Sequence, residues 1–232
     1  MPEWWSYSLA DFVMFSPAVY ERLFELENAR LWPYQCVALL AGVVMLVLLL
    51  GGRERRQRVA QHIAALAWLV CAWVYFHRSY ASIHTYANGF AVLFAAQGVL
   101  LLLDALVGKR ATSDARDRTA GFGVTIVGLA VLVQPLLFLL GGRAQMQTEL
   151  FACMPDPTVL ATIGVLAARR TTRGWLFVVP LLWSIYSALT LYTMLPYPLI
   201  AIAAGMAAAQ AVLALLLSIQ RLRPRRRGAH HA

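Results

Sequence analysis

The stretch VALLAGVVMLVLLLGGRERRQR, residues 37–58, joins an uninterrupted apolar run to a cluster of four arginines. The apolar part approaches the roughly 20 residues that a helix needs to cross a hydrocarbon layer about 30 Å thick. A second run, LIAIAAGMAAAQAVLALLLSI at residues 199–219, reaches that length. Together the two runs predict helices that lie within a bilayer and are bounded by basic segments.

The composition of the whole chain agrees with this prediction. Of the 232 residues, 60% are apolar and 13% are charged, and the mean hydropathy is +0.64. Soluble domains of this size have a lower apolar fraction. We therefore predict an all-α integral membrane protein whose helices pack against one another and against lipid.

The apolar runs divide the chain into three parts. An N-terminal segment, residues 1–33, precedes a membrane domain, residues 34–219, and a basic tail follows at residues 220–232. Within the membrane domain we predict seven transmembrane helices, at about 34–50, 59–77, 87–107, 122–140, 157–168, 175–194 and 198–219.

Basic residues fall in alternate loops between these predicted helices and in the tail. They comprise sixteen of the chain's 20 lysines and arginines, namely Arg53, Arg55, Arg56, Arg58, Lys109, Arg110, Arg116, Arg118, Arg169, Arg170, Arg173, Arg221, Arg223, Arg225, Arg226 and Arg227. All sixteen lie on one side of the membrane if the helices alternate in direction, and the positive-inside rule makes that side cytoplasmic. The N-terminus is then expected outside and the C-terminus inside.

The N-terminal segment lacks the basic region, apolar core and cleavage site of a signal peptide, so we expect the chain to be mature from its start. Ser16 and Pro17 favour the start of a helix that ends before Pro33. Polar residues are expected on one face of this helix: Glu21, Arg22, Glu25, Glu27, Asn28 and Arg30. The pattern is typical of an interfacial helix on the outer leaflet, and a lid over an outward-facing cavity is the alternative.

The stretch YFHRSYASIHTYANG, residues 75–89, is the outer turn between the second and third predicted helices. Its tyrosines suit the aromatic belt of a membrane. His77 and His84 are either polar residues at the water boundary or a functional pair that binds a metal ion or titrates along a transport path.

A second outer feature is LFACMPDPTVLATIGVLAA, residues 150–168. Asp156 and Pro157 favour a helix start, and the helix that follows is too short to cross a bilayer alone. The backbone before it must be irregular and buried in protein or in a wet cavity. Glu149, Cys153 and Asp156 flank this break and are candidate ligands, although a proline-rich loop that only caps the fold is equally open.

Together with the outer hairpin, this break predicts a ligand or ion site. It would be formed by His77, His84, Cys153, Asp156 and Glu149. Imidazole and thiolate are ligands for zinc or copper(I), so His77, His84 and Cys153 are the candidate ligands for a transition metal ion.

On the inner side, antiparallel packing of the second and third predicted helices places His62 and Asp104 at the same depth. A histidine and a carboxylate there could relay a proton. The alternative is that Asp104 pairs with the arginines at 53–58. Buried glutamines in this class of protein usually bond to neighbouring helices, which is the expected role of Gln97, Gln134 and Gln210.

Several chemistries are excluded by the residues that they need. The only lysine is Lys109, in a predicted cytoplasmic loop, so a retinal Schiff base within the bundle is excluded. Cys36, Cys71 and Cys153 form no C-x-x-C pair, and no hydrolase, zinc-protease or phosphate-loop motif is present. We expect a protein that is not an enzyme, with no catalytic residues and no nucleic-acid partner.

The sequence resembles a bacterial family of polytopic inner-membrane proteins classed as domain of unknown function 6064. Four segments carry the resemblance, in the same order: ENARLWPYQ at 27–35, FHRSYASIH at 76–84, CMPDPTVLATIGVL at 153–166 and VVPLLWS at 178–184. The resemblance implies a multi-pass location in the bacterial inner (plasma) membrane and no known activity.

The chain departs from the family pattern at three places. Phe76 precedes His77 where relatives tend to have tyrosine, His84 follows Ile83 where they tend to have asparagine, and Cys153 is displaced from its usual position between prolines. Because the resemblance implies no known activity, it transfers no catalytic residue to this chain.

We expect the protein to handle a small solute or ion at the outward-facing polar site, as a transporter does. Two alternatives remain open. One is a non-catalytic subunit that docks onto membrane-protein partners, and the other is a seven-helix sensor that passes its signal to a partner. In each case the lipid bilayer is the first partner.

Overall fold

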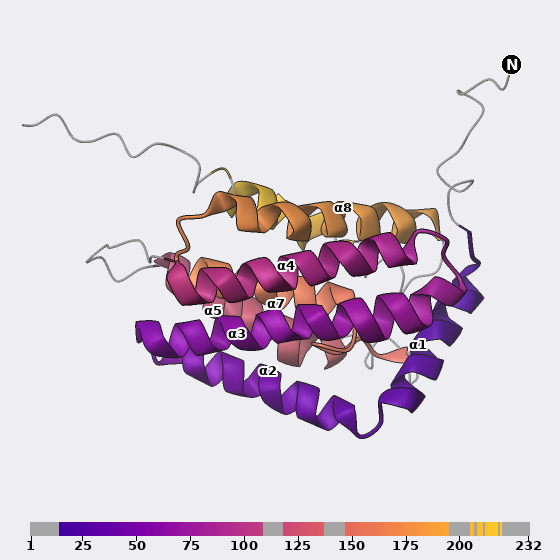
Figure 1. Ribbon diagram of the computed structural model, residues 1–232, viewed down its shortest axis with the longest axis horizontal. Coiled ribbons are helices and arrows are strands. Elements are labelled where there is room, and N and C mark those ends of the chain that lie inside the picture. Colours follow the sequence, from indigo (N-terminus) through magenta and orange to yellow (C-terminus); the bar gives the residue numbers. More distant parts are fainter. Residues whose placement is uncertain are drawn as a thin grey trace, which may run out of the picture.

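The computed structural model describes residues 14–108, 118–136 and 147–194, and residues 205–219 apart from 207, 211 and 218 (Figure 1). In these parts of the chain the regular structure is helical. The α-helices are α1 (Pro17–Leu31), α2 (Tyr34–Leu50), α3 (Glu54–Val70), α4 (Ala87–Val107), α5 (Arg118–Gly128), α7 (Pro155–Ala168) and α8 (Val178–Thr193). Two π-helical segments, η3 (Cys71–Ser79) and η5 (Leu129–Val133), and two 3-10 turns, η4 (Tyr80–Ser82) and η7 (Gly174–Phe177), extend them.

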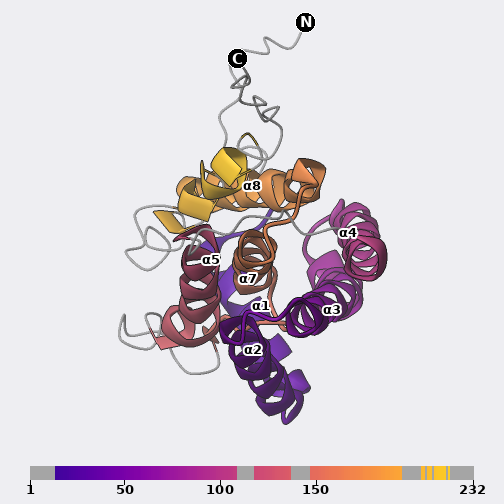
Figure 2. The same cartoon turned by 90° about the vertical axis from the view of Figure 1, so that its left-hand side faces the viewer.

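Helix α7 lies at the centre of the bundle, surrounded by α2, α3, α5 and α8 (Figure 2). Thirteen of its residues are buried, and only Leu160 keeps partial exposure. Small residues such as Ala161 and Gly164 let the neighbouring helices approach closely. This helix is therefore apolar on every side because protein covers every side.

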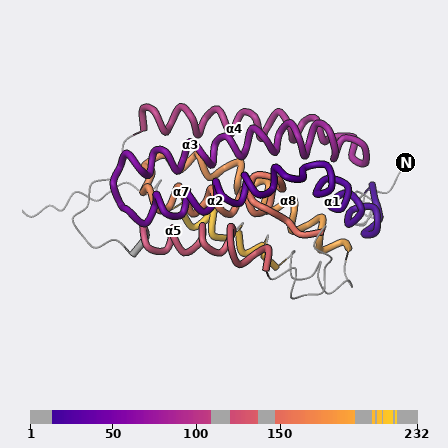
Figure 3. Tube along the Cα trace, turned by 90° about the horizontal axis from the view of Figure 1, so that it is seen from below, coloured from indigo at the N-terminus to yellow at the C-terminus, as the bar shows by residue number. Residues whose placement is uncertain are grey.

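Helix α3, η3 and η4 form one continuous helical run from Glu54 to Ser82, which is the longest among the described residues. It packs antiparallel to α4, and the two run side by side along the bundle (Figure 3). Gly98 of α4 makes this packing close, since a Cβ there would lie 2.8 Å from a methyl group of Leu69.

Three helices are long and apolar enough to cross a membrane: Glu54–Ser82, Ala87–Val107 and Gly174–Thr193. A fourth is obtained if α1 and α2, which meet at 91°, form one broken span. Three further apolar helices are shorter, at Ala120–Leu136, Pro155–Ala168 and Ala208–Leu217. By length and composition the described residues thus contain three or four candidate membrane-spanning helices and not the predicted seven.

Helix α1 begins as predicted, with Ser16 as its N-cap accepting a hydrogen bond from the Val19 amide at 3.4 Å. It lies across one end of the bundle (Figures 1 and 3). The predicted polar face is wrong at two positions, because Glu27 and Asn28 are each 2% exposed. The Glu27 side chain bonds to Ser79, and the Asn28 side chain bonds to the Thr148 carbonyl. Part of the predicted polar face of α1 therefore packs against the bundle.

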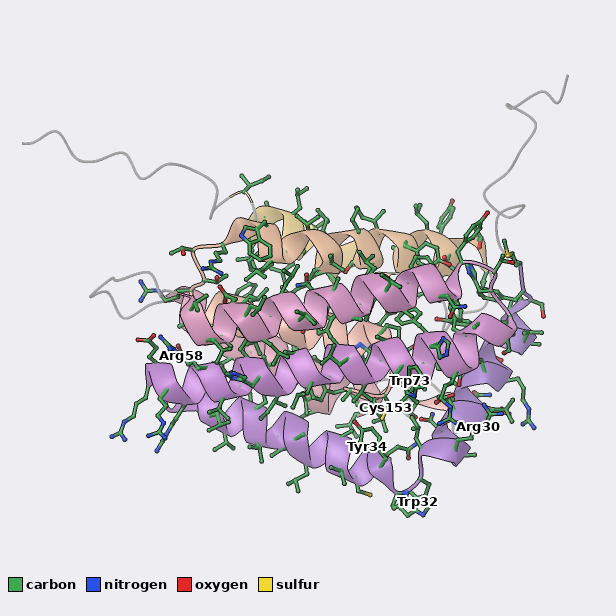
Figure 4. All side chains as sticks on the ribbon, in the orientation of Figure 1. Arg30, Trp32, Tyr34, Arg58, Trp73 and Cys153 are labelled. Carbon is green, nitrogen blue, oxygen red and sulfur yellow. The ribbon has the colours of Figure 1, made fainter. Side chains whose placement is uncertain are left out.

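The described basic segments gather at the opposite end of the bundle. Gln57 at the start of α3 donates to the Ala168 carbonyl at the end of α7, at 3.5 Å. Arg58 donates to the Leu106 carbonyl at the end of α4, at 3.4 Å. Figure 4 shows Arg58 at this end and Arg30 of α1 at the other. The predicted basic loop from Lys109 and the arginine-rich tail lie outside the described residues.

Helices α5 and α7 touch through their backbones where Gly123 crosses Gly164. A Cβ on Gly123 would lie 2.4 Å from the Ala168 nitrogen and 2.5 Å from the Gly164 oxygen. A Cβ on Gly164 would lie 2.7 Å from the Gly123 oxygen. Backbone atoms cannot move aside as a flexible side chain can, so both positions require glycine.

We predict that Gly123→Ala or Gly164→Ala destabilises the protein by about 1–3 kcal/mol, because either methyl group forces α5 away from α7. The control is Gly121→Ala, since a Cβ there meets nothing within 4 Å. Alanine at that exposed helical position should be neutral or stabilising by up to about 1 kcal/mol. Melting temperatures in detergent will measure the difference. Equal values for the wild type and all three variants would contradict the close contact of α5 with α7.

Candidate functional site

The chain enters α7 through an irregular segment that is buried in the protein. Phe151, Ala152, Cys153 and Met154 are each at most 4% exposed, and Ala152 has a left-handed backbone with φ of 62°. The Thr158 hydroxyl holds this turn by accepting from the Ala152 amide at 2.9 Å and donating to the Met154 carbonyl at 2.7 Å. The irregular backbone is therefore satisfied internally, as burial in an apolar interior requires.

Asp156 lies in the first turn of α7 and is 6% exposed. Trp183 Nε1 donates to its Oδ1 at 2.6 Å, and the Ser187 hydroxyl donates to its Oδ2 at 2.8 Å. Both donors belong to α8 and both are neutral. Among the described residues no ion pair joins this carboxylate to a lysine, arginine or histidine, so it is a buried acid held only by neutral donors.

His84 lies in the turn before α4 and is 7% exposed. Its Nδ1 accepts from the Tyr86 amide at 3.2 Å, so Nε2 carries the proton and donates to the Tyr186 hydroxyl at 3.0 Å. The Tyr186 and Tyr80 hydroxyls are 3.2 Å apart, and the His84 ring stacks on Tyr80 with centroids 5.0 Å apart. Burial lowers the pKa of His84, which favours this neutral form.

Helix α8 brings these two groups together. Trp183 and Ser187 hold Asp156, and the neighbouring Tyr186 reaches His84. Tyr80 joins this group through its hydroxyl, which lies 3.2 Å from the hydroxyl of Tyr186. We call this group the α8 cluster, and it comprises Tyr80, His84, Asp156, Trp183, Tyr186 and Ser187.

His77 lies apart from the α8 cluster. Its ring stacks on Trp73 with centroids 4.7 Å apart, and its Nδ1 is 2.9 Å from Asn88 Oδ1. These residues line an open groove of about 500 Å³ between η3 and α4. The structure therefore separates the two histidines: the helix continues past His77 to Ser82, and only then does the turn direct His84 inward.

Cys153 and Glu149 are both buried, and Figure 4 shows Cys153 near Tyr34 of α2. The carbonyl of Thr148, the residue before Glu149, accepts a hydrogen bond from Asn28 of α1 at 3.0 Å. The predicted outer residues thus divide between the α8 cluster, the groove at His77 and the buried segment that precedes α7.

The predicted metal site is not assembled. In the parts of the chain that are described, no group of three His, Cys, Asp or Glu side chains could hold a metal ion. His77 faces Asn88, His84 bonds to tyrosines, and the buried Cys153 is adjacent to neither. The donor set that the sequence suggested for zinc or copper(I) therefore does not fit this fold.

At the other end of α7, Asp104 has partners that the sequence did not indicate. Gln61 Nε2 donates to Asp104 Oδ2 at 3.0 Å and to the Leu101 carbonyl at 2.8 Å. Arg169 lies 3.4 Å from Oδ2 and Arg173 lies 3.3 Å from Oδ1, and Arg169 also donates to Gln61 Oε1. We call these four residues the Asp104 cluster.

The predicted pair of His62 and Asp104 is wrong. His62 Nδ1 is 2.7 Å from the Arg58 carbonyl of its own helix, while the preceding Gln61 faces inward. The alternative of an arginine at 53–58 is also wrong for Arg58, which pairs with Glu54 at 2.6 Å. The residue of α3 that contacts Asp104 is therefore Gln61, one position before the expected His62.

One face of α3 supplies polar partners along the whole of α7. Besides Gln57 and Gln61, Trp68 donates to Thr162 at 2.7 Å and Cys71 lies 3.5 Å from the Thr158 hydroxyl. These α3 residues recur at intervals of three, four or seven positions, which is the spacing of one helical face. This spacing is visible in the sequence, and from it the inward-facing role of these residues could have been predicted.

Comparison with known proteins gives a family but no activity. A family model described as "Family of unknown function (DUF6064)" matches residues 18–190, a range that includes both clusters. No curated protein and no solved structure matches the chain.

We predict that Asp104→Asn destabilises the protein by about 3 kcal/mol or more, because it leaves the buried Arg169 without a counter-charge. The matched control is Glu54→Gln, which removes an exposed ion pair with Arg58 and should cost at most about 1 kcal/mol. Unfolding in detergent will measure both variants. Equal losses would show that the Asp104 cluster contributes no more than a surface pair.

We predict that stability falls as the pH drops below the ordinary histidine value of 6.5. His84 has a lowered pKa, so in this range the unfolded chain binds a proton that the folded protein rejects. The stability that neutral His84 contributes is complete above pH 6.5 and is lost toward the lower folded pKa. His84→Gln should flatten this part of the melting-temperature profile, and an unchanged profile would refute the assignment.

Proposed function

We propose a function for this chain, which belongs to the family of unknown function DUF6064, from the geometry at the two ends of α7. The protein is a multi-pass integral membrane protein that handles a small solute or ion at an outward-facing polar site. Its three or four helices of membrane-spanning length support the location. The α8 cluster supports the site.

The proposed orientation places the basic end of the bundle in the cytoplasm. The described arginines at the start of α3 and the end of α7 share this end with the Asp104 cluster. By the positive-inside rule, α1 and His84, at the opposite end, then face outward. The seven-span arrangement is part of this proposal: α7 extends only about 21 Å, so the buried segment before it completes the crossing.

The observation that carries the proposal is the buried carboxylate of Asp156. An ionised acid in an apolar bundle is costly unless a positive charge compensates it. Trp183 and Ser187 supply neutral hydrogen bonds, which leave the net charge in place. We therefore assign Asp156 as the group that binds a proton or a small cation.

The rest of the α8 cluster can connect Asp156 to the outer surface. Imidazole and phenol groups both donate and accept hydrogen bonds. His84 donates to the Tyr186 hydroxyl, and that hydroxyl is then free to donate to Tyr80. In the proposed mechanism these three residues carry a proton from the outer end of the bundle toward Asp156.

One observation favours the alternative of a membrane subunit. Helix α2 lies at the edge of the bundle (Figure 2), and its outward side chains are strongly exposed, with Leu40 at 64% and Leu50 at 68%. Such an apolar face suits the helices of a partner as well as it suits lipid. This alternative requires no ion to move.

The test is ion flux into liposomes that contain the purified protein, with fluorescent probes for H⁺, Na⁺ and K⁺. We expect flux of one of these ions in the wild type and the protein-free rate in Asp156→Asn, which keeps the shape of the side chain but not its charge. Glu25→Gln is the control, because Glu25 is paired with Arg22 at the surface of α1. Wild-type flux no higher than in empty liposomes, for all three ions, would remove the transport proposal and favour the subunit.

A further inference from the structure

A second pocket lies between α5 with η5, α7 and the C-terminal helical segment Ala208–Leu217. Its volume is about 340 Å³, which is within the range of small-molecule sites. Ile126, Leu160 and Leu213 are among the apolar residues that line it. Leu160, the only residue of α7 with partial exposure, therefore opens into this pocket.

Two glutamines are the polar residues of this pocket. Gln134 and Gln210 are each 2% exposed. Among the described residues, neither Gln134 Oε1 nor either amide atom of Gln210 has a hydrogen-bond partner. The expected interhelical hydrogen bonds of these atoms are thus unmade, whereas Gln97 makes its bond, to the Leu176 carbonyl at 2.8 Å.

Leaving buried amide atoms unpaired in an apolar pocket costs free energy, which a ligand with matching groups would recover. The three atoms define what such a ligand carries. Two oxygens accept, so they need two donors, and one NH₂ group donates, so it needs an acceptor. Two hydroxyl groups satisfy all three, since each hydroxyl both donates and accepts.

The charge and the position of the pocket narrow the ligand further. None of the described residues that line it is ionisable, so a phosphate or a free carboxylate would be buried there without a counter-charge. Phe122 and Leu129 line the pocket and are 49% and 45% exposed, so the apolar outer surface continues into it. The ligand is therefore uncharged and carries an apolar chain that can leave the pocket along this surface.

We infer that this pocket binds a neutral lipid with a free pair of hydroxyl groups, as in a monoacylglycerol. The diol bonds to Gln134 and Gln210, and the first part of the acyl chain packs against Ile126 and Leu160. The remainder of the chain lies along Phe122 and Leu129 in the hydrocarbon layer. This site is independent of Asp156 and of the proposed ion handling.

The test is photolabelling of the full chain in phosphatidylcholine nanodiscs. The probe is 1-monooleoylglycerol with a diazirine in its acyl chain, and mass spectrometry locates the label. We expect labelled peptides from α5 and from the C-terminal helical segment. Unlabelled 1-monooleoylglycerol should compete, whereas its dimethyl ether, which accepts hydrogen bonds but cannot donate them, should not.

Gln134→Leu should reduce labelling about fivefold, the effect of one lost hydrogen bond, and Gln210→Leu, which loses two, should reduce it about 25-fold. Thr125→Val is the control, because Thr125 lies on the same helix but bonds to its own Gly121 carbonyl, so labelling should persist. Without probe, Gln210→Leu should melt at the same or a higher temperature, since it removes an unpaired amide. Equal competition by the ether, unchanged labelling in both leucine variants, or a lower melting temperature of Gln210→Leu would each overturn the inference.

Discussion

The enclosure of α7 by other helices is the constraint on which the rest of the structure depends. A helix whose polar groups are all shielded from water must find every polar partner within the protein. Thr158 supports the irregular segment before it, Thr162 accepts from Trp68, and Asp156 accepts from two residues of α8. The polar residues of α3 and α8 are therefore placed where the central helix needs them.

The α8 cluster and the Asp104 cluster lie at opposite ends of this enclosed helix. An acidic residue lies at the first end and a basic residue at the second. Asp156 is in the first turn, where the positive end of the helix dipole favours an acid. Arg169 follows the last turn, where the negative end favours a cation, and Asp104 compensates its charge. Among the described residues, an ion pair is present at the second end and not at the first. In the proposed function, the first end is the one that binds an ion.

Local composition predicted much of the fold, because apolar runs and helix caps are local properties. The bounds of α2 and α4 agree with the predicted ranges 34–50 and 87–107, and the family resemblance is confirmed by the match over residues 18–190. Contacts between helices were harder to predict, since the sequence of one helix does not say which face of another helix it meets. Gln61 was therefore overlooked in favour of His62, and His77 was placed with His84 although the helix carries it to another face.

The π-helical segment η3 sets a limit on how α3 could have changed during evolution. Before this segment, Gln61 and Trp68 face the interior, and Tyr75 within it and Tyr80 just after it face the interior as well. The i→i+5 pattern of a π-helix accommodates an additional residue in an otherwise α-helical run. Loss of one residue there would turn the part of the helix that follows by about 100° and move its tyrosines from the interior to the surface. Related chains should therefore vary in length within their loops and conserve the residue count between Trp68 and Tyr80.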